Sequence, residues 1–211
     1  MSHRLRKLRL LTLPAVAGLA LASCQQADPA PEPSVTATAA SPSPETPTPT
    51  SSPEPTPKPA TAEGPAENIP VPEMPELAKE NSKNGAMSFA EHYFDIINYS
   101  TATTTSGEMK KLTSRECELC GERFIDPLDT AILNDAWQVG GEYEFRLIDL
   151  LQPSENRAVA IFEYSSEPQA IYLDANDPVV EWEAVNNRVV SFELEFDDGW
   201  EVVGLVTSEN E

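Results

Sequence analysis

The sequence is poor in basic residues. Its 211 residues include 14 Lys and Arg against 35 Asp and Glu, which gives a formal net charge of −21 at pH 7. Such a surplus of carboxylates repels phosphate groups, so a nucleic acid or an anionic lipid headgroup is excluded as a partner held by a basic patch. A neutral or cationic partner fits this charge better, although net charge of this kind also serves solubility alone.

Residues that carry catalysis or bind metals are scarce as well. The chain has three cysteines and two histidines. Of the two histidines, only His92 lies beyond the first 23 residues. Structural zinc normally takes four Cys or His ligands, and we find no Ser/His/Asp spacing and no phosphate-binding glycine loop. The sequence therefore predicts no metal, no cofactor and no catalytic residue, and we do not expect an enzyme.

Long apolar runs are absent too. Residues 10–22 follow a basic stretch, are interrupted by Pro14 and end at Ser23 and Cys24, whereas a spanning helix needs about 20 predominantly apolar residues. A basic stretch followed by a short apolar run is typical of a signal peptide. We therefore expect residues 1–23 to direct export and then to be removed.

The end of this segment carries a recognisable motif. The residues Leu21-Ala22-Ser23-Cys24 resemble the lipobox of bacterial lipoprotein precursors. The resemblance implies cleavage before Cys24 and attachment of a diacylglyceryl group to its sulfur. Two acyl chains, at about 0.8 kcal/mol per buried CH₂, anchor a protein stably. The expected partner of acylated Cys24 is the lipid bilayer, and the expected location is the extracytoplasmic face of the cell membrane.

Residues 24–72 consist mainly of Pro, Thr, Ser, Ala and Glu. A segment with so few large apolar side chains cannot build a core. We expect a disordered tether, in which ~45 residues at about 3.1 Å each reach on the order of 140 Å when extended. A spacer of this length suits display of a domain at the cell wall.

Residues 75–211 are expected to form one globular domain. Apolar residues recur at intervals of three and four over 82–104, 107–112 and 117–135, which predicts helices. Apolar and polar residues alternate over 143–147, 157–164, 189–196 and 200–206, which predicts strands, with a hairpin turn at Asp198-Gly199. Helices followed by antiparallel strands predict an α+β fold, with N-terminal helices packed on a curved antiparallel sheet of about four strands.

Several residues of this domain carry a resemblance. They are Gly85, Ala86, Phe89, Tyr93, Asn98, Tyr99, Leu112, Cys117 and Cys120. In this pattern the chain resembles a family of uncharacterised lipoproteins of high-GC Gram-positive bacteria. The order of elements is also similar to the cone-shaped fold of nuclear transport factor two, scytalone dehydratase and ketosteroid isomerase. That similarity implies a cone-like domain, and a fold by itself does not fix a function.

The pair Cys117 and Cys120 allows three interpretations. Paired cysteines outside the cytoplasm normally oxidise, which favours a local disulfide. Thiol–disulfide exchange needs a cysteine of low pKa near basic groups, whereas Glu116, Glu118 and Glu122 surround this pair. Zinc would require two further Cys or His ligands.

His92 and Asp95 lie one turn apart on the longest predicted helix. Beside a pocket, a histidine with a nearby carboxylate can act as a general base near neutral pH, but the same residues are equally typical of a solvated helix face. Our main hypothesis is a non-enzymatic module that binds a small molecule, a cell-wall component or a protein. The alternatives are an enzyme that uses His92 and a thiol–disulfide protein.

Overall fold

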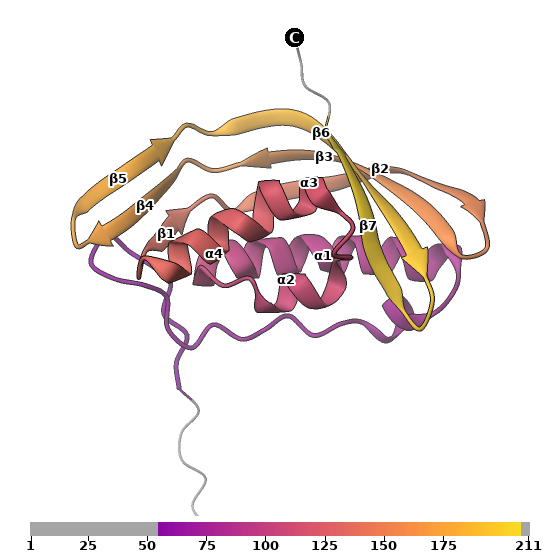
Figure 1. Ribbon diagram of the computed structural model, residues 1–211, viewed down its shortest axis with the longest axis horizontal. Coiled ribbons are helices and arrows are strands. Elements are labelled where there is room, and N and C mark those ends of the chain that lie inside the picture. Colours follow the sequence, from indigo (N-terminus) through magenta and orange to yellow (C-terminus); the bar gives the residue numbers. More distant parts are fainter. Residues whose placement is uncertain (1–54, 208–211) are drawn as a thin grey trace, which may run out of the picture. The chain divides into compact units, whose positions relative to one another are not determined.

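A computed structural model describes residues 55–207 of the chain (Figure 1). The helical elements are η1 (Glu76–Lys79), α1 (Lys83–Thr103), α2 (Gly107–Leu112), α3 (Glu118–Cys120), the π-helix η2 (Gly121–Ile125) and α4 (Asp126–Leu133). The strands are β1 (Trp137–Gly140), β2 (Tyr143–Ser154), β3 (Arg157–Ser166), β4 (Gln169–Asp174), β5 (Asp177–Trp182), β6 (Val185–Phe196) and β7 (Trp200–Thr207). The expected signal peptide and lipobox lie outside the described residues.

The strands form two antiparallel sheets, with strand orders β1-β4-β5 and β2-β3-β6-β7. The predicted α+β fold, with N-terminal helices on a single sheet of about four strands, is therefore wrong, because the described chain is mostly β-structure. The missed sheet is built from short strands. β1 has four residues, and the turn between β4 and β5 lies in an acidic stretch where Asn176 takes a positive φ of 65°. Pro178, which cannot donate to a ladder, lies on the edge strand β5.

Helix α1 agrees with the helix predicted over 82–104. Its N-terminus is capped by Ser82, whose Oγ accepts a hydrogen bond from the Gly85 amide at 3.0 Å. It ends at Thr104, a β-branched residue in the left-handed region with φ 50°. The Thr104 hydroxyl oxygen accepts a hydrogen bond from the Gln138 amide at 2.9 Å. The strained end of α1 is thereby joined to the start of β1.

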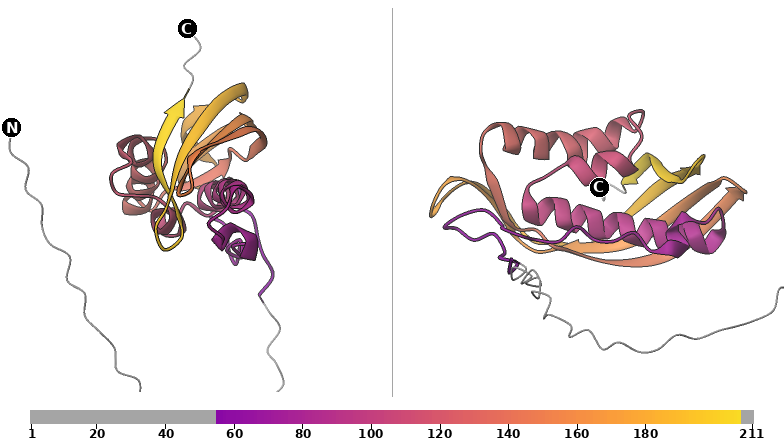
Figure 2. Two further views of the ribbon diagram at one scale, coloured as in Figure 1. Left: turned by 90° about the vertical axis from the view of Figure 1, so that its right-hand side faces the viewer. Right: turned by 90° about the horizontal axis from the view of Figure 1, so that it is seen from below.

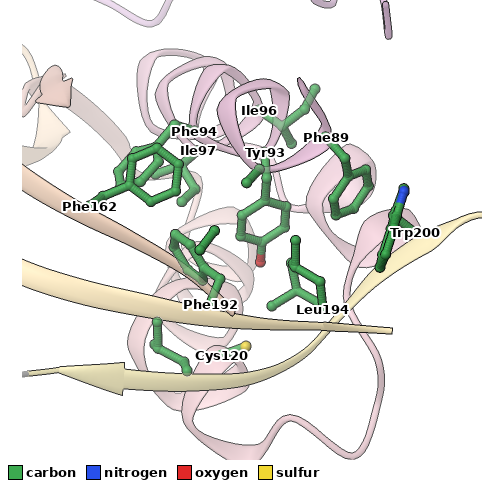
Figure 3. Packing of buried hydrophobic residues seen from close by; sticks show 14 of the residues in the cluster. Phe89, Tyr93, Phe94, Ile96, Ile97, Cys120, Phe162, Phe192, Leu194 and Trp200 are labelled. Atoms are coloured by element: carbon green, nitrogen blue, oxygen red, sulfur yellow. The ribbon is translucent and has the colours of Figure 1, made fainter. Parts of the chain in front are cut away.

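The core lies between α1 and the four-stranded sheet (Figures 1 and 3). The ring of Phe94 lies 4.5 Å from Phe145, 4.8 Å from Phe162 and 5.4 Å from Phe192, measured between centroids. Tyr93 meets Phe192 edge to face at 5.2 Å. Full burial of each such side chain contributes about 1.5–3 kcal/mol, so these aromatic contacts fix α1 on the sheet.

Gly85 is required where η1 packs on the first turn of α1. A Cβ at this position would lie 2.0 Å from the Glu80 carbonyl oxygen. The same carbonyl accepts a hydrogen bond from Trp200 Nε1 at 2.8 Å. Gly85 thus allows a close approach that also ties η1 to the beginning of β7.

Residues 55–74 pack on the domain as an irregular segment, although residues up to 72 were expected to belong to the tether. The Thr61 carbonyl accepts a hydrogen bond from Trp137 Nε1 at 2.8 Å, and the Ala62 carbonyl accepts one from the Asn176 amide at 2.8 Å. In Figure 2 this segment runs along the domain before it enters α1. The packed unit therefore begins earlier than the boundary expected at residues 72–75.

Candidate functional site

Of the cavities considered below, all formed by residues 55–207, the largest has a volume of about 680 Å³ and lies between α4 and the three-stranded sheet. The floor comes from α1, α2 and α4, where the buried side chains of Thr101, Met109 and Leu128 face it. β1, β4 and β5 form the opposite wall. The lining from these strands and from β2 consists of Gln138, Tyr143, Gln169, Ile171, Leu173, Val179 and Trp182.

Helix α4 is held over the cavity by Asp129. Its carboxylate accepts hydrogen bonds from Lys110 Nζ at 2.6 and 2.7 Å and from the Ser106 hydroxyl. These hydrogen bonds, with that from Lys110 the stronger influence, hold the pKa of Asp129 below its usual range. The position of the helix is therefore fixed at neutral pH by α2 and the loop before it.

Several polar side chains in the cavity wall donate hydrogen bonds to one another or to backbone. Gln138 Nε2 donates to Gln169 Oε1 at 2.7 Å, and the Thr130 hydroxyl donates to the Asp126 carbonyl at 2.8 Å. Asn134 Nδ2 donates to the Thr130 carbonyl at 2.7 Å. Because these donors already have acceptors within the protein, a ligand loses little if it offers them no hydrogen bond. The interior suits an apolar molecule.

Large apolar side chains line the mouth of the cavity while exposed to solvent. Leu173 is 45% exposed, Val179 52% and Trp182 47%. Exposed apolar surface of this kind beside a concave site is typical of ligand-binding grooves. Acidic side chains of Glu122 and Asp126 lie at the same cavity, and both residues are exposed.

A smaller cavity of about 190 Å³ adjoins the first, and the two have Arg123, Phe124 and Tyr143 in common. Burial, assisted by the neighbouring Tyr164 ring at 5.7 Å, raises the pKa of Tyr143 above its ordinary value. Tyr143 therefore stays protonated and uncharged in the physiological range.

His92 and Asp95 both lie on α1 but do not meet at the largest cavity. His92 is buried, and its Nδ1 has no hydrogen-bond partner among the described residues. Burial lowers the pKa of His92, while the nearby charge of Asp95 acts in the opposite direction. Asp95 lines a separate cavity of about 480 Å³ whose other wall includes Pro59 and Pro70. Partial desolvation raises the pKa of Asp95.

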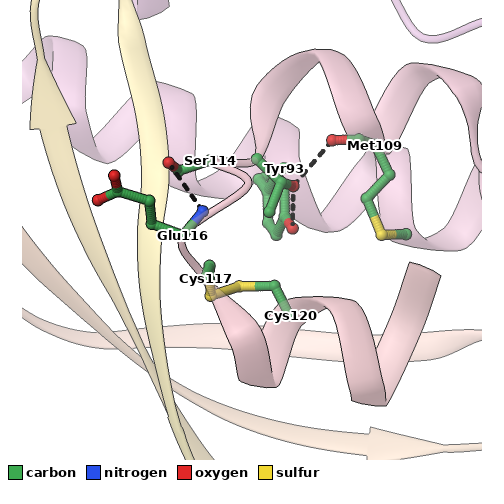
Figure 4. The surroundings of a disulfide bond; sticks show 7 residues. Tyr93, Met109, Ser114, Glu116, Cys117 and Cys120 are labelled. Carbon is green, nitrogen blue, oxygen red and sulfur yellow. Dashed lines mark hydrogen bonds between the residues drawn. A yellow bond between two sulfur atoms is a disulfide. The ribbon is translucent and has the colours of Figure 1, made fainter. Parts of the chain in front are cut away.

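The structure joins Cys117 and Cys120 in a disulfide at the start of α3 (Figure 4). Both residues are buried, with 4% and 0% of their surface exposed. Such burial restricts the approach of a second thiol to the sulfur atoms, and attack by a thiol is the step that exchange requires. In this position the disulfide closes the first turn of α3 against the core.

Residues 55–207 contain neither a membrane-spanning helix nor a cluster of metal ligands. No helix in this range has the length and apolar character needed to cross a membrane. No group of three His, Cys, Asp or Glu side chains in the same range is placed to bind a metal ion. Cys24, the expected lipidation site, lies outside the described residues.

Sequence reasoning missed the cavity altogether. Its lining comes from eight elements, so no local spacing marks it. The nearest to a signal is on β5, where three exposed large apolar residues, Val179, Val180 and Trp182, stand in an acidic stretch, and Val179 and Trp182 line the cavity. Of the predicted site residues, only Asp95 lines one of the three cavities described above.

Comparison with curated proteins and with solved structures finds no match. A family model described as a family of unknown function, DUF6318, matches residues 55–205. That span begins at the proline-rich segment on the domain and includes both sheets and every lining residue of the largest cavity. The chain therefore belongs to the DUF6318 family.

Proposed function

We propose that the domain is a non-enzymatic module that binds an apolar small molecule in the cavity between α4 and the three-stranded sheet. The observation that carries the proposal is the cavity of about 680 Å³, with paired polar groups in its wall and half-exposed apolar side chains at its mouth. Ligand pockets in proteins typically have volumes of about 300–1,000 Å³ and predominantly apolar linings.

The proposal also places the domain on the extracytoplasmic face of the cell membrane, anchored through acylated Cys24. It is supported by the lipobox-like residues before Cys24 and by the short apolar segment that precedes them. The buried disulfide between Cys117 and Cys120 supports an oxidising compartment. In that position the module would take up a molecule from the wall or the surrounding medium.

Binding can be tested with N-phenyl-1-naphthylamine, an uncharged probe that fluoresces in apolar sites. Purified protein should enhance its fluorescence saturably. Ala131 lies on the cavity-facing side of α4, so Ala131→Trp should fill the site and weaken probe binding by at least about tenfold, or ~1.4 kcal/mol. Leu133→Trp, on the same helix at a position that is 84% exposed, is the matched control. Equal binding by both variants would contradict the assigned site.

The anchor has a separate test. Cells that express the protein and grow with an alkyne-labelled fatty acid should attach the label to it, and Cys24→Ala should abolish the attachment. Label that persists on the Cys24→Ala protein would refute this anchoring site.

A further inference from the structure

We infer that the ligand is an elongated hydrocarbon chain with an uncharged head group, and that Phe124 sets the length of chain the protein accepts. This inference rests on the proposed function. Two cavities, of about 680 and 190 Å³, have Phe124 in common. A side chain that lines both cavities forms part of the wall between them.

The smaller cavity leads toward the centre of the core. Its remaining lining is aromatic or aliphatic apart from one threonine, and consists of Phe94, Tyr164, Val190, Phe192, Leu205 and Thr207. Phe94 and Phe192 are core residues at the interface between α1 and the sheet (Figure 3). A chain that passed from the larger cavity into the smaller one would meet the rings of Phe94 and Phe192 and the aliphatic side chains of Val190 and Leu205, which suit methylene groups.

Phe124 is the apolar part of the wall that is held less tightly than Tyr143. The backbone of Tyr143 is fixed by the side chain of Asn98. Asn98 Oδ1 accepts a hydrogen bond from the Tyr143 N–H at 2.8 Å, and Asn98 Nδ2 donates one to the Tyr143 carbonyl at 3.0 Å. Phe124 lies instead in η2, a single π-helical turn in which no residue is fully buried. Its ring stacks on no other aromatic ring among the described residues. Single π-turns inside helices are frequent at functional sites.

The charges at the mouth determine the head group. Glu122 and Asp126 lie at the entrance, and Arg123 lies between them in sequence. The protein as a whole carries a formal net charge of −21. An anionic head group would meet this field unfavourably, and no cluster of carboxylates among the cavity-lining residues is buried enough to demand a cation. An uncharged head group is not repelled by the carboxylates and does not depend on a buried cluster of them.

The test measures the affinity of linear 1-alkanols of increasing length by displacement of N-phenyl-1-naphthylamine. For wild-type protein, each added CH₂ should tighten binding about fourfold, equivalent to about 0.8 kcal/mol, until the chain fills the larger cavity. Beyond that length the gain should stop. In Phe124→Ala the gain should continue to longer chains, and in Phe124→Leu, which keeps the residue large and apolar, the limit should lie at or close to that of wild type.

Ile125→Ala is the matched control, because Ile125 lies in the same π-turn and packs on the core but lines neither of the two cavities. It should keep the wild-type length limit. If wild-type protein binds the alkanols and Phe124→Ala shows the same limit, the role of Phe124 is refuted while the proposed function stands. If wild-type protein binds neither probe nor alkanols, the proposed function fails and this inference fails with it.

Discussion

Removal of the buried hydroxyl of Tyr93 should destabilise the protein at neutral pH and stabilise it at alkaline pH. Tyr93 is fully buried, and its hydroxyl lies 2.8 Å from Thr113 Oγ1, which donates to the Met109 carbonyl at 2.8 Å (Figure 4). Because the single hydroxyl proton of Thr113 is used on Met109, Tyr93 must be the donor in the other hydrogen bond. Burial raises the pKa of Tyr93 to about 12.

The size of the effect follows from the hydrogen bond that Tyr93 donates and from its raised pKa. At pH 7, Tyr93→Phe loses one neutral hydrogen bond, which costs about 1 kcal/mol. In the unfolded chain tyrosine loses its proton near its ordinary pKa of about 10. Between that value and about 12 the unfolded state releases a proton that the folded state keeps, so stability falls as the pH rises. By pH 11.5 this loss amounts to about 2 kcal/mol, and the order of stability of the two proteins should reverse near pH ~10.7.

The assay is urea unfolding of wild type and Tyr93→Phe at pH 7 and pH 11.5, followed by tryptophan fluorescence. Wild type should be more stable than the variant by about 1 kcal/mol at pH 7 and less stable by about 1 kcal/mol at pH 11.5. Tyr99→Phe, at a half-buried position on the same helix, controls for the removal of any tyrosine. An identical difference between wild type and Tyr93→Phe at both pH values would refute the reasoning.

Three further predictions use the same unfolding assay. Asn98→Ala leaves the first backbone N–H and carbonyl of β2 without their side-chain partners and should lower the free energy of unfolding by about 2 kcal/mol. A change near zero would contradict the role of Asn98 in holding the start of β2. Burial lowers the pKa of His92, so wild-type stability should fall as the pH drops below about 6.5, and His92→Gln should flatten this part of the profile. Simultaneous replacement of Cys117 and Cys120 by Ala should cost about 2 kcal/mol, as expected for a very short closed loop. Dithiothreitol, which can reduce the disulfide once the chain unfolds in urea, should destabilise wild type and leave that double variant unchanged.

Local patterns predicted α1, β3 and β7 well, whereas of the long strand β2 (Tyr143–Ser154) they predicted only residues 143–147. The apolar residues of α1, such as Phe89, Tyr93 and Ile97, recur at helical spacing because one face of the helix is buried against a sheet. The strands β3, β6 and β7 alternate for the equivalent reason. Burial on one face leaves a period in the sequence, and a period can be read without knowledge of the partner.

The three-stranded sheet and the cavity leave no such period. In β5 nearly every residue is exposed, so Val179, Val180 and Trp182 follow no alternation between buried and solvated positions. The cavity depends on the tertiary placement of side chains as far apart in sequence as Thr101 and Trp182. The composition of residues 55–74 argued for a free tether, because proline-rich sequence has no core of its own. Its backbone carbonyls nevertheless serve as acceptors for the domain.

Those carbonyls also define where the protein can be cut. A fragment that begins at residue 75 would lack the acceptors at Thr61 and Ala62, leaving the largely buried Trp137 indole N–H and the Asn176 amide without their partners. It would also lose the prolines that wall the cavity next to Asp95.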